Sequence, residues 1–393
     1  MNMKVLMVIS QFHPIIGGAE KQAQILGQAL IDRGIDVDVV TGWWDMRTPR
    51  REKVGGLRVQ RNFSAWGMFG IRGLRTIGGL IYMVSLAAYL LSHRREYDVV
   101  HVHQALYPAF VALFVGKGML GKTVLVKTAS SGMTSDIKQM RRFPLGRVQL
   151  NYMLKNLECL VAVSRISGRE YLAIGFPEPR IEYIPNGVAV PSLDMKTYGR
   201  VRNVVTTARL SKEKGIDILI QAWARLAETK GGMKLFIVGQ GPLESELRGL
   251  CASLGTGDSV EFCGLTNNVE KYLNAADLFV LPSRSEGLSN SLLESMGHGI
   301  PCVATDVGGA RELFQAGNES ISVGGFLVGK NGVLVNPDDS QGLSEAIGYL
   351  IRAEEGNGAL GRRGRAHVQE MYSIERVADR YITLYRKLLS RRC

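Results

Sequence analysis

The chain has little of what a secreted or zinc-stabilised protein needs. Its five cysteines lie far apart and form no C-x-x-C pair: Cys159, Cys251, Cys263, Cys302 and Cys393. This spacing argues against a disulfide framework and against a zinc site, and it favours a reducing compartment. The N-terminal MNMKVLMVIS enters a strand-like run directly, without the longer apolar core and cleavage site of a signal peptide. We therefore expect a cytoplasmic protein.

Long apolar runs are absent as well. The one stretch that suggests a membrane is IGGLIYMVSLAAYLL, 77–91, whose 15 residues fall short of the ~20 that a spanning helix needs. Two arginines precede it and two follow it: Arg72, Arg75, Arg94 and Arg95. One interpretation is a buried helix of the first domain. The other is a helix that lies in the bilayer interface, held by these arginines and by the basic run KQMRR at 138–142.

Acidic residues are scarce in the first half of the chain. Residues 1–193 carry a net charge of +11 and residues 194–393 carry +1, which together give the +12 of the chain. A basic half fits nucleic acid, an anionic membrane or a phosphorylated substrate. Because the positive charge is scattered and no recognition motif or interleaved aromatic stripe accompanies it, a nucleic-acid partner is disfavoured.

The chain does have a regular alternation of short apolar runs and longer amphipathic segments. The predicted strands are 4–10, 36–42, 97–103, 122–128 and 160–164 in the first half, and 201–209, 234–239, 260–264, 278–282, 300–304 and 332–336 in the second. Helical patterns between them include 19–33, 216–228, 243–253 and 339–352. Such alternation predicts parallel sheets flanked by helices, with enough strands for two sheets.

A break between two α/β domains is predicted in IPNGVAVPSLDMKTYGR, 184–200, which is rich in Pro and Gly and has no apolar period. We place the first domain at 1–190 and the second at 191–373. In open α/β sheets, ligands bind at the carboxyl ends of the strands. Two such domains facing each other would form a cleft lined by strand-end loops.

The first strand is followed by FHPIIGGAE, 12–20, which opens a helix. Gly17 and Gly18 remove side chains where a ligand must approach, and the helix N-terminus beyond them favours negative charge. The stretch is not G-x-G-x-x-G, so a plain strand-to-helix turn is the simpler interpretation and phosphate contact the alternative.

Two cations follow the strand 201–209 in ARLSKEKGIDILIQA: Arg209 ends the strand and Lys214 stands just before a helix. In a strand-end loop they could clamp a diphosphate, with arginine as a planar fork and lysine as a point charge. A solvated basic loop explains the spacing equally well.

A third turn lies in VGQGPLESEL, 238–247. Gly239 and Gly241 bracket it, and Pro242 suits a first helical position. This pattern favours a structural turn.

The most informative stretch is SEGLSNSLLESMGHGIPCVATDVGG, 285–309, in which Glu286 and Glu294 stand eight positions apart. The small polar residues between them are capping candidates whose N–H groups would point at a ligand. An ionised carboxylate accepts two hydrogen bonds in a fork, which suits vicinal hydroxyls. One glutamate per sugar ring, with N–H donors between them, matches hexose, diphosphate and ribose. A capped helix with two unrelated acids is the alternative.

Taken together, these stretches resemble the retaining glycosyltransferases of family 4. The resemblance covers nearly the whole chain and includes 17–20, 163–172, 184–188, 208–217, 235–247 and 260–309. Its most specific part is the E-x7-E pattern in its EGLSNSLLE form. It implies the GT-B fold: two Rossmann-like, doubly wound domains facing across a cleft, with the C-terminal helix, about 374–393, packed back onto the first domain.

The resemblance also implies roles for single residues. Glu286 would contact the hydroxyls of the transferred sugar, and Glu294 would bind the ribose. Arg209 and Lys214 would stabilise the leaving diphosphate. The expected donor-binding residues are Gly17, Gly18, Gly239, Gly264, Leu265, Gly287, Leu288, Ser289, Asn290, Ser291, Leu292 and Glu294.

Such enzymes need no bound metal, because protein cations and helix dipoles stabilise the developing charge. The chain has no D-x-D triplet in a strand-end loop and no His/Asp/Glu cluster at ligand spacing. We therefore expect no metal and no cofactor, and a donor of UDP or GDP type. By resemblance we expect same-face attack assisted by the leaving phosphate, since no nucleophile is obvious.

One position departs from the family pattern. Many members carry a histidine just after the fourth strand of the first domain, whereas this chain reads KTASSGMTSD, 127–136. Ser130 and Ser131 can donate hydrogen bonds but carry no charge near neutral pH. We expect this loop to replace the histidine through backbone and hydroxyl contacts. His13 and His103, which follow two other strands, are further acceptor-side candidates, and each is equally well a polar residue at a strand end.

The leading hypothesis is a retaining hexosyltransferase that acts on a glycan or lipid-linked acceptor in cell-surface polysaccharide or glycolipid synthesis. Its basic first domain would contact an anionic membrane. One alternative is a sugar-phosphate-using phosphorylase or synthase on the same fold. Another is a catalytically silent GT-B binding module, which only the missing histidine supports.

Overall fold

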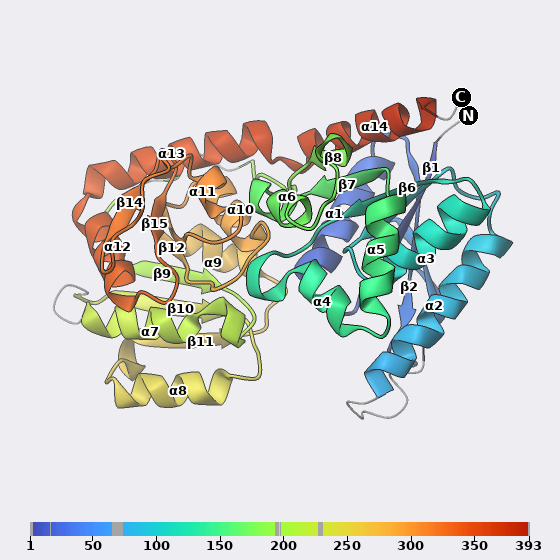
Figure 1. Cartoon of the computed structure of the whole chain (residues 1–393). Helices are drawn as coiled ribbons and strands as arrows, with labels where there is room; N and C mark the ends of the chain where they lie inside the picture. Colours follow the sequence, from blue (N-terminus) through green and yellow to red (C-terminus); the bar gives the residue numbers. More distant parts are fainter. Residues whose placement is uncertain are drawn as a thin grey trace. The chain divides into compact units, whose positions relative to one another are not determined.

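The computed structural model describes residues 3–15, 17–64, 74–192, 196, 198–226 and 231–391. The chain divides into two compact units, coloured by sequence in Figure 1. The N-terminal unit is Met1–Gly187 with Ile374–Cys393, and the C-terminal unit is Val188–Ser373. The boundaries expected from the sequence, 190/191 and 373/374, lie close to these breaks.

The N-terminal unit is built on an eight-stranded sheet in the order β3-β4-β2-β1-β5-β6-β7-β8. Its neighbours pair in parallel, except that β3 and β4 are antiparallel. The strands are β1 (Lys4–Ile9), β2 (Asp36–Trp43), β3 (Arg51–Val54), β4 (Leu57–Phe63), β5 (Val99–His103), β6 (Thr123–Lys127), β7 (Cys159–Ala162) and β8 (Ile181–Tyr183). The sequence analysis missed β3, β4 and β8, because these segments are short or interrupted by charged residues.

The helices of this unit cover both faces of the sheet. They are α1 (Gly18–Ile31), α2 (Leu74–Ser92), α3 (Tyr107–Val111), α4 (Asp136–Arg142), α5 (Gly146–Asn156), α6 (Arg165–Leu172) and α14 (Ile374–Ser390). Other helical segments are the π-helix η2 (Ala112–Met119) and the 3-10 turns η3 (Gly132–Thr134) and η4 (Glu178–Arg180). The helix α3 continues directly into the π-helix η2.

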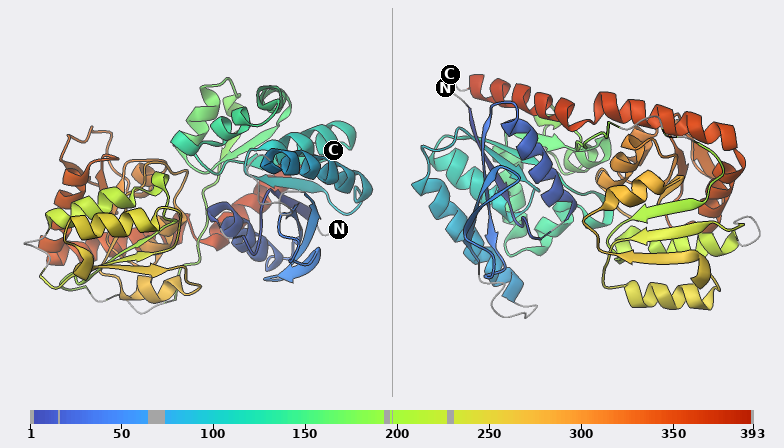
Figure 2. Two further views of the ribbon diagram at one scale, coloured as in Figure 1. Left: turned by 90° about the horizontal axis from the view of Figure 1, so that it is seen from below. Right: turned by 180° about the vertical axis from the view of Figure 1, so that it is seen from behind.

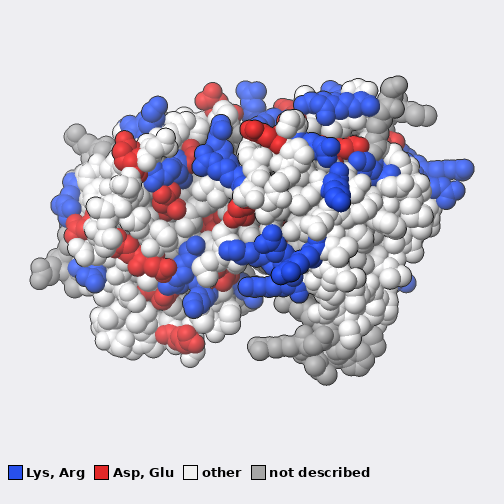
Figure 3. Space-filling view, in the orientation of Figure 1, with Lys and Arg blue, Asp and Glu red and all other residues white. Residues whose placement is uncertain are grey.

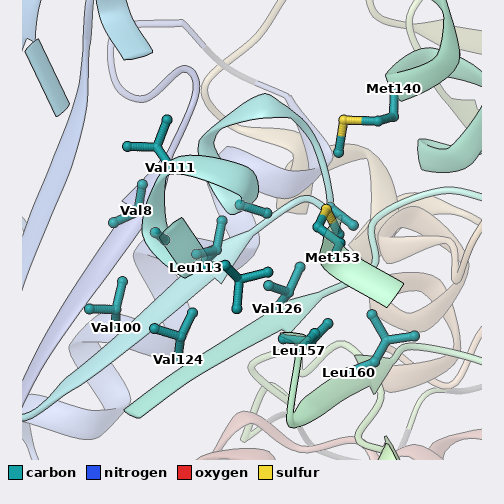
Figure 4. Close-up of a cluster of buried hydrophobic side chains, with 14 of the residues drawn as sticks. Val8, Val100, Val111, Leu113, Val124, Val126, Met140, Met153, Leu157 and Leu160 are labelled. Carbon is teal, nitrogen blue, oxygen red and sulfur yellow. The ribbon is translucent and has the colours of Figure 1, made fainter. Parts of the chain in front are cut away.

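Alternation along the strands gives the sheet two apolar faces. Leu6 and Val8 of β1 belong to the core beneath α2, α3 and α5. Figure 4 shows part of this core, where side chains of neighbouring strands meet residues of the covering helices. Val5 and Met7 belong to the core on the opposite face, beneath α1 and α14. Because both faces are buried, the strands read as nearly continuous apolar runs.

The C-terminal helix α14 completes the second face. Its buried residues recur every three or four positions: Ile374, Val377, Ala378, Tyr381, Ile382, Leu384, Tyr385 and Leu388. The helix packs beside α1, and Arg33 just after α1 bonds to Asp379 at 2.5 Å. The right panel of Figure 2 shows α1 on the side of the sheet from which α2 and α5 are absent.

The C-terminal unit contains a seven-stranded sheet in the order β11-β10-β9-β12-β13-β15-β14. Its neighbours are parallel, except that β14 and β15 are antiparallel. The strands are β9 (Asn203–Thr207), β10 (Lys234–Val238), β11 (Val260–Gly264), β12 (Leu278–Leu281), β13 (Cys302–Thr305), β14 (Phe326–Val328) and β15 (Val333–Val335). The sequence analysis missed only β14 among these. The two parallel-dominated sheets confirm the expected pair of Rossmann-like domains.

Helices cover the second sheet on both faces as well. They are α7 (Ile216–Arg225), α8 (Glu244–Ser253), α9 (Val269–Ala275), α10 (Asn290–Gly297), α11 (Ala310–Leu313), α12 (Ser340–Arg352) and α13 (Glu354–Met371), with the 3-10 turns η5 (Lys212–Lys214) and η6 (Gly257–Ser259). Trp223 of α7 is fully buried and donates its indole N–H to Ser259.

The apolar stretch 77–91 lies within α2. One side of the helix is buried through Tyr82, Leu86 and Leu90, but Val84 is 72% exposed. The expected buried helix is therefore right for one side only. In the ranges that the structure describes, no helix combines the length and apolar content needed to cross a bilayer. Arg72 and the side chain of Arg75 lie outside the described residues.

Candidate active site

The candidate site lies at the carboxyl edge of the C-terminal sheet. Strands β9 and β12 are parallel neighbours there. The loop after β9 carries Arg209 and Lys214, and the loop after β12 carries Glu286. Because carboxyl ends of parallel strands share one edge, the two motifs meet.

A hydrogen-bonded group joins these loops. Lys214 Nζ donates to Glu286 Oε1 at 2.7 Å, and Ser283 Oγ donates to the same oxygen at 2.7 Å. The Glu286 side chain is 12% exposed and that of Lys214 is 25% exposed, so water screens this pair less than a surface pair. The bond leaves two of the three N–H donors of Lys214 for other acceptors.

A second group clamps the same loops from the side, centred on Arg284. Its guanidinium bonds to Asp217 at 2.9 and 2.6 Å and to Asp338 at 2.5 Å. It also donates to the Lys212 carbonyl at 2.7 Å, and its own backbone N–H donates to the Glu213 carbonyl at 2.8 Å. The turn that carries Lys214 is therefore fixed to the loop that carries Glu286.

The electrostatics of this clamp favour the charged forms of its members. The hydrogen bond to Asp217 raises the pKa of Arg284. Burial alone would raise the pKa of Asp217, yet the bonds from Arg284 keep it below its usual value. Both groups stay ionised near neutral pH, so the clamp persists there.

Two glycines allow these loops to touch. Gly215 has φ +62°, and a Cβ on it would lie 2.1 Å from the Pro282 carbonyl oxygen. Gly308 has φ +55°, and a Cβ there would lie 2.5 Å from the Glu286 carbonyl oxygen. A side chain at either position would separate the segments that hold Lys214 and Glu286.

Helix α10 begins at this edge. Ser289 caps it by accepting from the Leu292 N–H at 3.4 Å, and its hydroxyl lies 3.0 Å from that of Ser291. Leu292 and Leu293 are fully buried beneath the first turn. Glu294 is partly exposed on the helix. The expected N-cap is thus present, and its first-turn N–H groups point beyond the helix start.

The remaining candidates of this unit lie around the same strand ends. Arg209 is exposed, and its guanidinium bonds to no residue that the structure describes. Gly239 donates its N–H to the Gly264 carbonyl at 2.9 Å, which joins the ends of β10 and β11. Leu265 follows directly and is 63% exposed. Gly287 and Leu288 are buried beside Glu286.

In the N-terminal unit, two candidates flank the start of α1. Gly17 is the N-cap residue and Gly18 the first residue of the helix, so the expected strand-to-helix turn is present. His13, after β1, is 46% exposed, with Nδ1 3.8 Å from a Glu52 carboxylate oxygen.

The loop that replaces the family histidine is held by internal hydrogen bonds. Ser130 Oγ donates to the Thr134 carbonyl at 2.5 Å and lies 3.2 Å from Asp136 Oδ1. The Ala129 N–H donates to Asp136 Oδ2 at 2.7 Å. Burial raises the pKa of Asp136 to about 6. Ser131 is buried and stands at the N-cap position of η3, without a capping bond from its side chain.

His103 is buried in the layer beneath α14 rather than displayed at the loop edge. Its ring stacks on His101 with centroids 4.2 Å apart, and His101 Nδ1 lies 2.7 Å from the Tyr385 hydroxyl. Nε2 of neither ring has a hydrogen-bond partner among the residues that the structure describes. Lys127 lies nearby over the Tyr381 ring. Burial lowers the pKa of both histidines and lowers that of Lys127 to about 7.

Sequence reasoning missed the residues that hold the site together. Asp217 and Arg284 stand inside the family stretches 208–217 and 260–309 but received no role from the sequence, and Asp338 lies outside every such stretch. A signal existed for the first two, because each stands two or three positions from a predicted site residue. In the described part of the chain, no group of three or more His, Cys, Asp or Glu side chains could hold a metal ion.

Two family models match the chain one after the other. The model described as Glycosyltransferase Family 4 matches residues 16–190, and the model described as Glycosyl transferases group 1 matches residues 201–353. N-acetyl-alpha-D-glucosaminyl L-malate synthase from Bacillus anthracis is 25% identical over 389 residues, which cover 96% of each chain. O-antigen chain mannosyltransferase C from Escherichia coli is 24% identical over 400 residues, covering 98% of this chain and 99% of the relative.

Solved structures match over the full length. Sucrose-phosphate synthase from Thermosynechococcus elongatus has a TM-score of 0.78 at 23% identity, covering 99% of this chain and 100% of that one. The Anabaena protein HepE, crystallised with UDP-glucose, has a TM-score of 0.74 at 19% identity, covering 98% and 100%. These likenesses establish the GT-B fold. With the two consecutive family matches, they identify the chain as a member of the family 4-type glycosyltransferases.

Proposed function

We propose that this glycosyltransferase is a retaining hexosyltransferase that moves a sugar from a UDP or GDP sugar to a glycan or lipid-linked acceptor. The observation that carries the proposal is the 2.7 Å hydrogen bond between Lys214 and Glu286, which joins two motif loops at adjacent strand ends. The relatives named as a mannosyltransferase and a glucosaminyl malate synthase support sugar transfer. HepE, crystallised with UDP and with UDP-glucose, supports a nucleotide-sugar donor.

In the proposed reaction, negative charge builds on the leaving diphosphate. Lys214 keeps two N–H donors for it, and the guanidinium of Arg209, which bonds to no described residue, supplies a planar fork. The first-turn N–H groups of α10 add partial positive charge. Donors placed in advance lower the barrier without reorganisation, and losing one costs about 3–4 kcal/mol in comparable enzymes. We assign the charge stabilisation to these groups and not to a metal ion.

The two glutamates orient the donor in this scheme. Glu286 is fixed by Lys214 and Ser283, so its carboxylate is positioned to accept from the hydroxyls of the transferred sugar. Glu294, on the same helix as the phosphate donors, accepts from the ribose. The bond from the anomeric carbon to the diphosphate oxygen breaks, and the acceptor oxygen bonds to that carbon on the same face. The acceptor proton passes to the leaving phosphate.

The test is release of nucleoside diphosphate from a panel of UDP, GDP and ADP sugars, in the presence of EDTA. Glu286→Ala and Arg209→Ala are compared with Arg202→Ala, an exposed arginine just before the opposite end of β9. Release from one donor that is lost in the first two variants and kept in the third supports the proposal. NMR of the product then reports whether the anomeric configuration is retained.

Other results favour other functions. Tight binding of a nucleoside diphosphate without release, with or without candidate acceptors, points to a silent binding module. Release that depends on free phosphate points to a phosphorylase. Activity that EDTA abolishes and Mg²⁺ restores contradicts metal independence.

We also propose that the protein works in the cytoplasm, in peripheral contact with the inner face of an anionic membrane. The unequal net charge of the two halves, +11 against +1, supports this contact. It would place a lipid-linked acceptor beside the more basic unit.

A further inference from the structure

The outer side of α2 is apolar although it faces solvent. Ile77, Leu80 and Val84 are 48%, 42% and 72% exposed. They follow one another at helical spacing, opposite the buried Tyr82 and Leu86. No charged residue occurs from Thr76 to Ser92. A surface helix of a globular protein normally presents charged or polar residues on this side, so the stripe needs an explanation beyond the fold.

Neighbouring helices continue the apolar surface. Phe114 of η2 is 49% exposed, and its ring lies 5.9 Å from that of Tyr152 on α5. Leu145 and Val148, at the start of α5, are 77% and 61% exposed. Leu145 has φ +55°, a conformation that asparagine or glycine adopts more easily. Neither packing nor backbone conformation therefore explains a leucine at this exposed position.

These side chains belong to one layer. Helix α2 packs on α3 and η2, and α3 packs on α5, all over the same face of the N-terminal sheet. Figure 1 shows α2, α3 and α5 side by side. The space-filling view in Figure 3 shows a broad uncharged area over these helices. We call it the apolar face: Ile77, Leu80, Val84, Phe114, Leu145 and Val148.

Cations border the apolar face, and acids are nearly missing from it. The segments 76–92, 107–119 and 132–156 contain a single acidic residue, Asp136, which is 2% exposed. The exposed cations of α4 and α5 are Lys138, Arg141, Arg142, Arg147 and Lys155, and none of them forms a salt bridge with a described residue. Figure 3 shows a group of Lys and Arg side chains over the region of α4.

The other border of the face is basic too. An open groove of about 390 Å³ beside α2 is lined by residues that include Arg50, Arg51, Phe63 and Tyr89. Both arginines are exposed. Acidic side chains lie on this side as well: Asp38, which pairs with Arg58, lies near Tyr89, and Glu96 follows Arg94 and Arg95 past the end of α2. Apolar side chains in the middle and cations at two borders form the pattern of an interfacial protein.

We propose that the apolar face docks on an anionic lipid bilayer, with its apolar side chains inserted at the headgroup level and its cations against the lipid phosphates. The inference rests on the proposed membrane contact and names the surface that makes it. A bilayer fits better than a second copy of the chain, because a symmetric contact would bring the same cations against one another. Aromatic and apolar side chains together with Lys and Arg are the groups that bind this interface.

The test is flotation of the purified full-length chain with vesicles of phosphatidylcholine and phosphatidylglycerol in equal parts. Val84→Ser with Phe114→Ser removes two exposed apolar groups, and Leu145→Asn with Val148→Ser removes two more. Each pair is expected to lower the partition coefficient about tenfold or more. Val323→Ser, which replaces a 94% exposed valine of the C-terminal unit, is the matched control and is expected to change nothing.

The charged border is tested separately. Arg141→Glu with Arg142→Glu is expected to lower binding about tenfold, and pure phosphatidylcholine vesicles are expected to bind the wild type weakly. Raising the salt concentration should weaken the wild type and leave the apolar contribution in place. Far-UV circular dichroism of each variant checks that it folds.

Three results would overturn the proposal. They are no binding of the wild type to the mixed vesicles, equal binding of the apolar variants and the wild type, and a dimer in solution that the same variants dissociate. Release of nucleoside diphosphate is measured without vesicles. A chain that transfers sugar but ignores vesicles loses this inference and the proposed membrane contact but keeps the proposed transferase activity. A chain that binds vesicles but releases nothing loses the proposed activity and keeps this inference.

Discussion

At the carboxyl edge of the C-terminal sheet, polar side chains bond to one another across loops, as Lys214 does to Glu286 and Arg284 does to Asp217. At the same edge of the N-terminal sheet, the polar residues are drawn into the fold. His103 lies beneath α14, and Ser130 is tied to its own loop. The polar side chains of the C-terminal edge therefore bond to one another across loops, whereas His103 and Ser130 of the N-terminal edge serve the fold and His13 stays 46% exposed.

This difference explains why the motifs differ in strength. Under the proposed function, a donor shared by many enzymes of one fold would require the same charges at the same strand ends, and the E-x7-E stretch would carry them. An acceptor that varies would leave the N-terminal edge free to use backbone groups and hydroxyls. The N-terminal candidates are thus weaker in sequence for a physical reason.

The largest expected effect concerns Lys214, which bonds to Glu286 at the edge of the C-terminal sheet. Lys214→Met removes a positive donor at the site, and we expect release of nucleoside diphosphate to fall about 100- to 1000-fold. Lys212→Met is the control, since Lys212 lies in the same turn with an exposed side chain and contributes only its carbonyl to the clamp. Equal losses in the two variants would mean that general basicity of the turn matters, and not the bond to Glu286.

The second effect concerns the buried His103 ring and the dependence of stability on pH. Burial holds the pKa of His103 below 6.5 in the folded state, so the ring contributes stability above pH 6.5 that is lost as the pH falls and the unfolded ring takes up a proton. Each such ring changes the free energy of unfolding by about 1.4 kcal/mol per pH unit. As the pH falls, we expect the free energy of unfolding of His103→Phe to decrease less steeply than that of the wild type, by this amount per pH unit. Urea unfolding between pH 6.5 and 5 measures both slopes.

The quantity to compare is the difference in free energy of unfolding between the wild type and His103→Phe at each pH. Lys127, with a pKa of about 7, is mostly protonated in both the folded and the unfolded state throughout that window. Asp136, with a pKa of about 6, takes up its proton in the folded state first and so acts in the opposite direction. Both contributions cancel in the comparison of variant and wild type. Parallel curves would show that the His103 ring is charged or solvated in the folded protein.

A smaller effect concerns the clamp. Arg284→Lys keeps the charge but loses the planar fork that bonds to Asp217 and the Lys212 carbonyl. We expect a loss of about 2 kcal/mol in stability of the C-terminal unit, with faster hydrogen exchange at 212–214. Arg248→Lys, in an exposed pair with Glu244, should cost less than about 0.5 kcal/mol. If both cost the same, the clamp adds nothing beyond a surface ion pair.

The smallest expected effect returns to the N-terminal edge. Ser130→Ala removes the hydroxyl that bonds to Thr134 and approaches Asp136, which should cost about 1 kcal/mol in stability. Turnover should fall far less than in Lys214→Met. A fall of equal size would place Ser130 in direct contact with a substrate and remove the contrast between the two edges.

Much of the fold could be predicted, and the reason is burial. Strands covered on both faces, such as 99–103 and 278–281, read as apolar runs, and α14 showed its packing stripe as an amphipathic period. The hairpin β3–β4 could not be found, because an edge pair exposed on one side carries arginines and glutamine within its strands. The sequence pattern therefore predicted strands that are buried on both faces and missed this partly exposed pair.

The site was predictable only in part. Lys214 and Glu286 could be placed in strand-end loops from the sequence, but the hydrogen bond between them was not predicted. The clamp around Arg284 depends on Asp338, which lies 54 positions away in sequence. No local pattern reports such a partner, so the residues that position the site emerge only from the fold.

Because the N-terminal unit needs residues from both sides of the C-terminal unit, the division at Gly187 and Ile374 affects the order in which the two units can fold during synthesis. The C-terminal unit is continuous and has all its strands once Ser373 has left the ribosome. The N-terminal unit, although made first, must wait for α14 to cover the face formed by Val5, Met7 and His101. During that interval an apolar sheet face stays open to chaperones or to aggregation. The N-terminal unit is therefore synthesised first but completes its fold last.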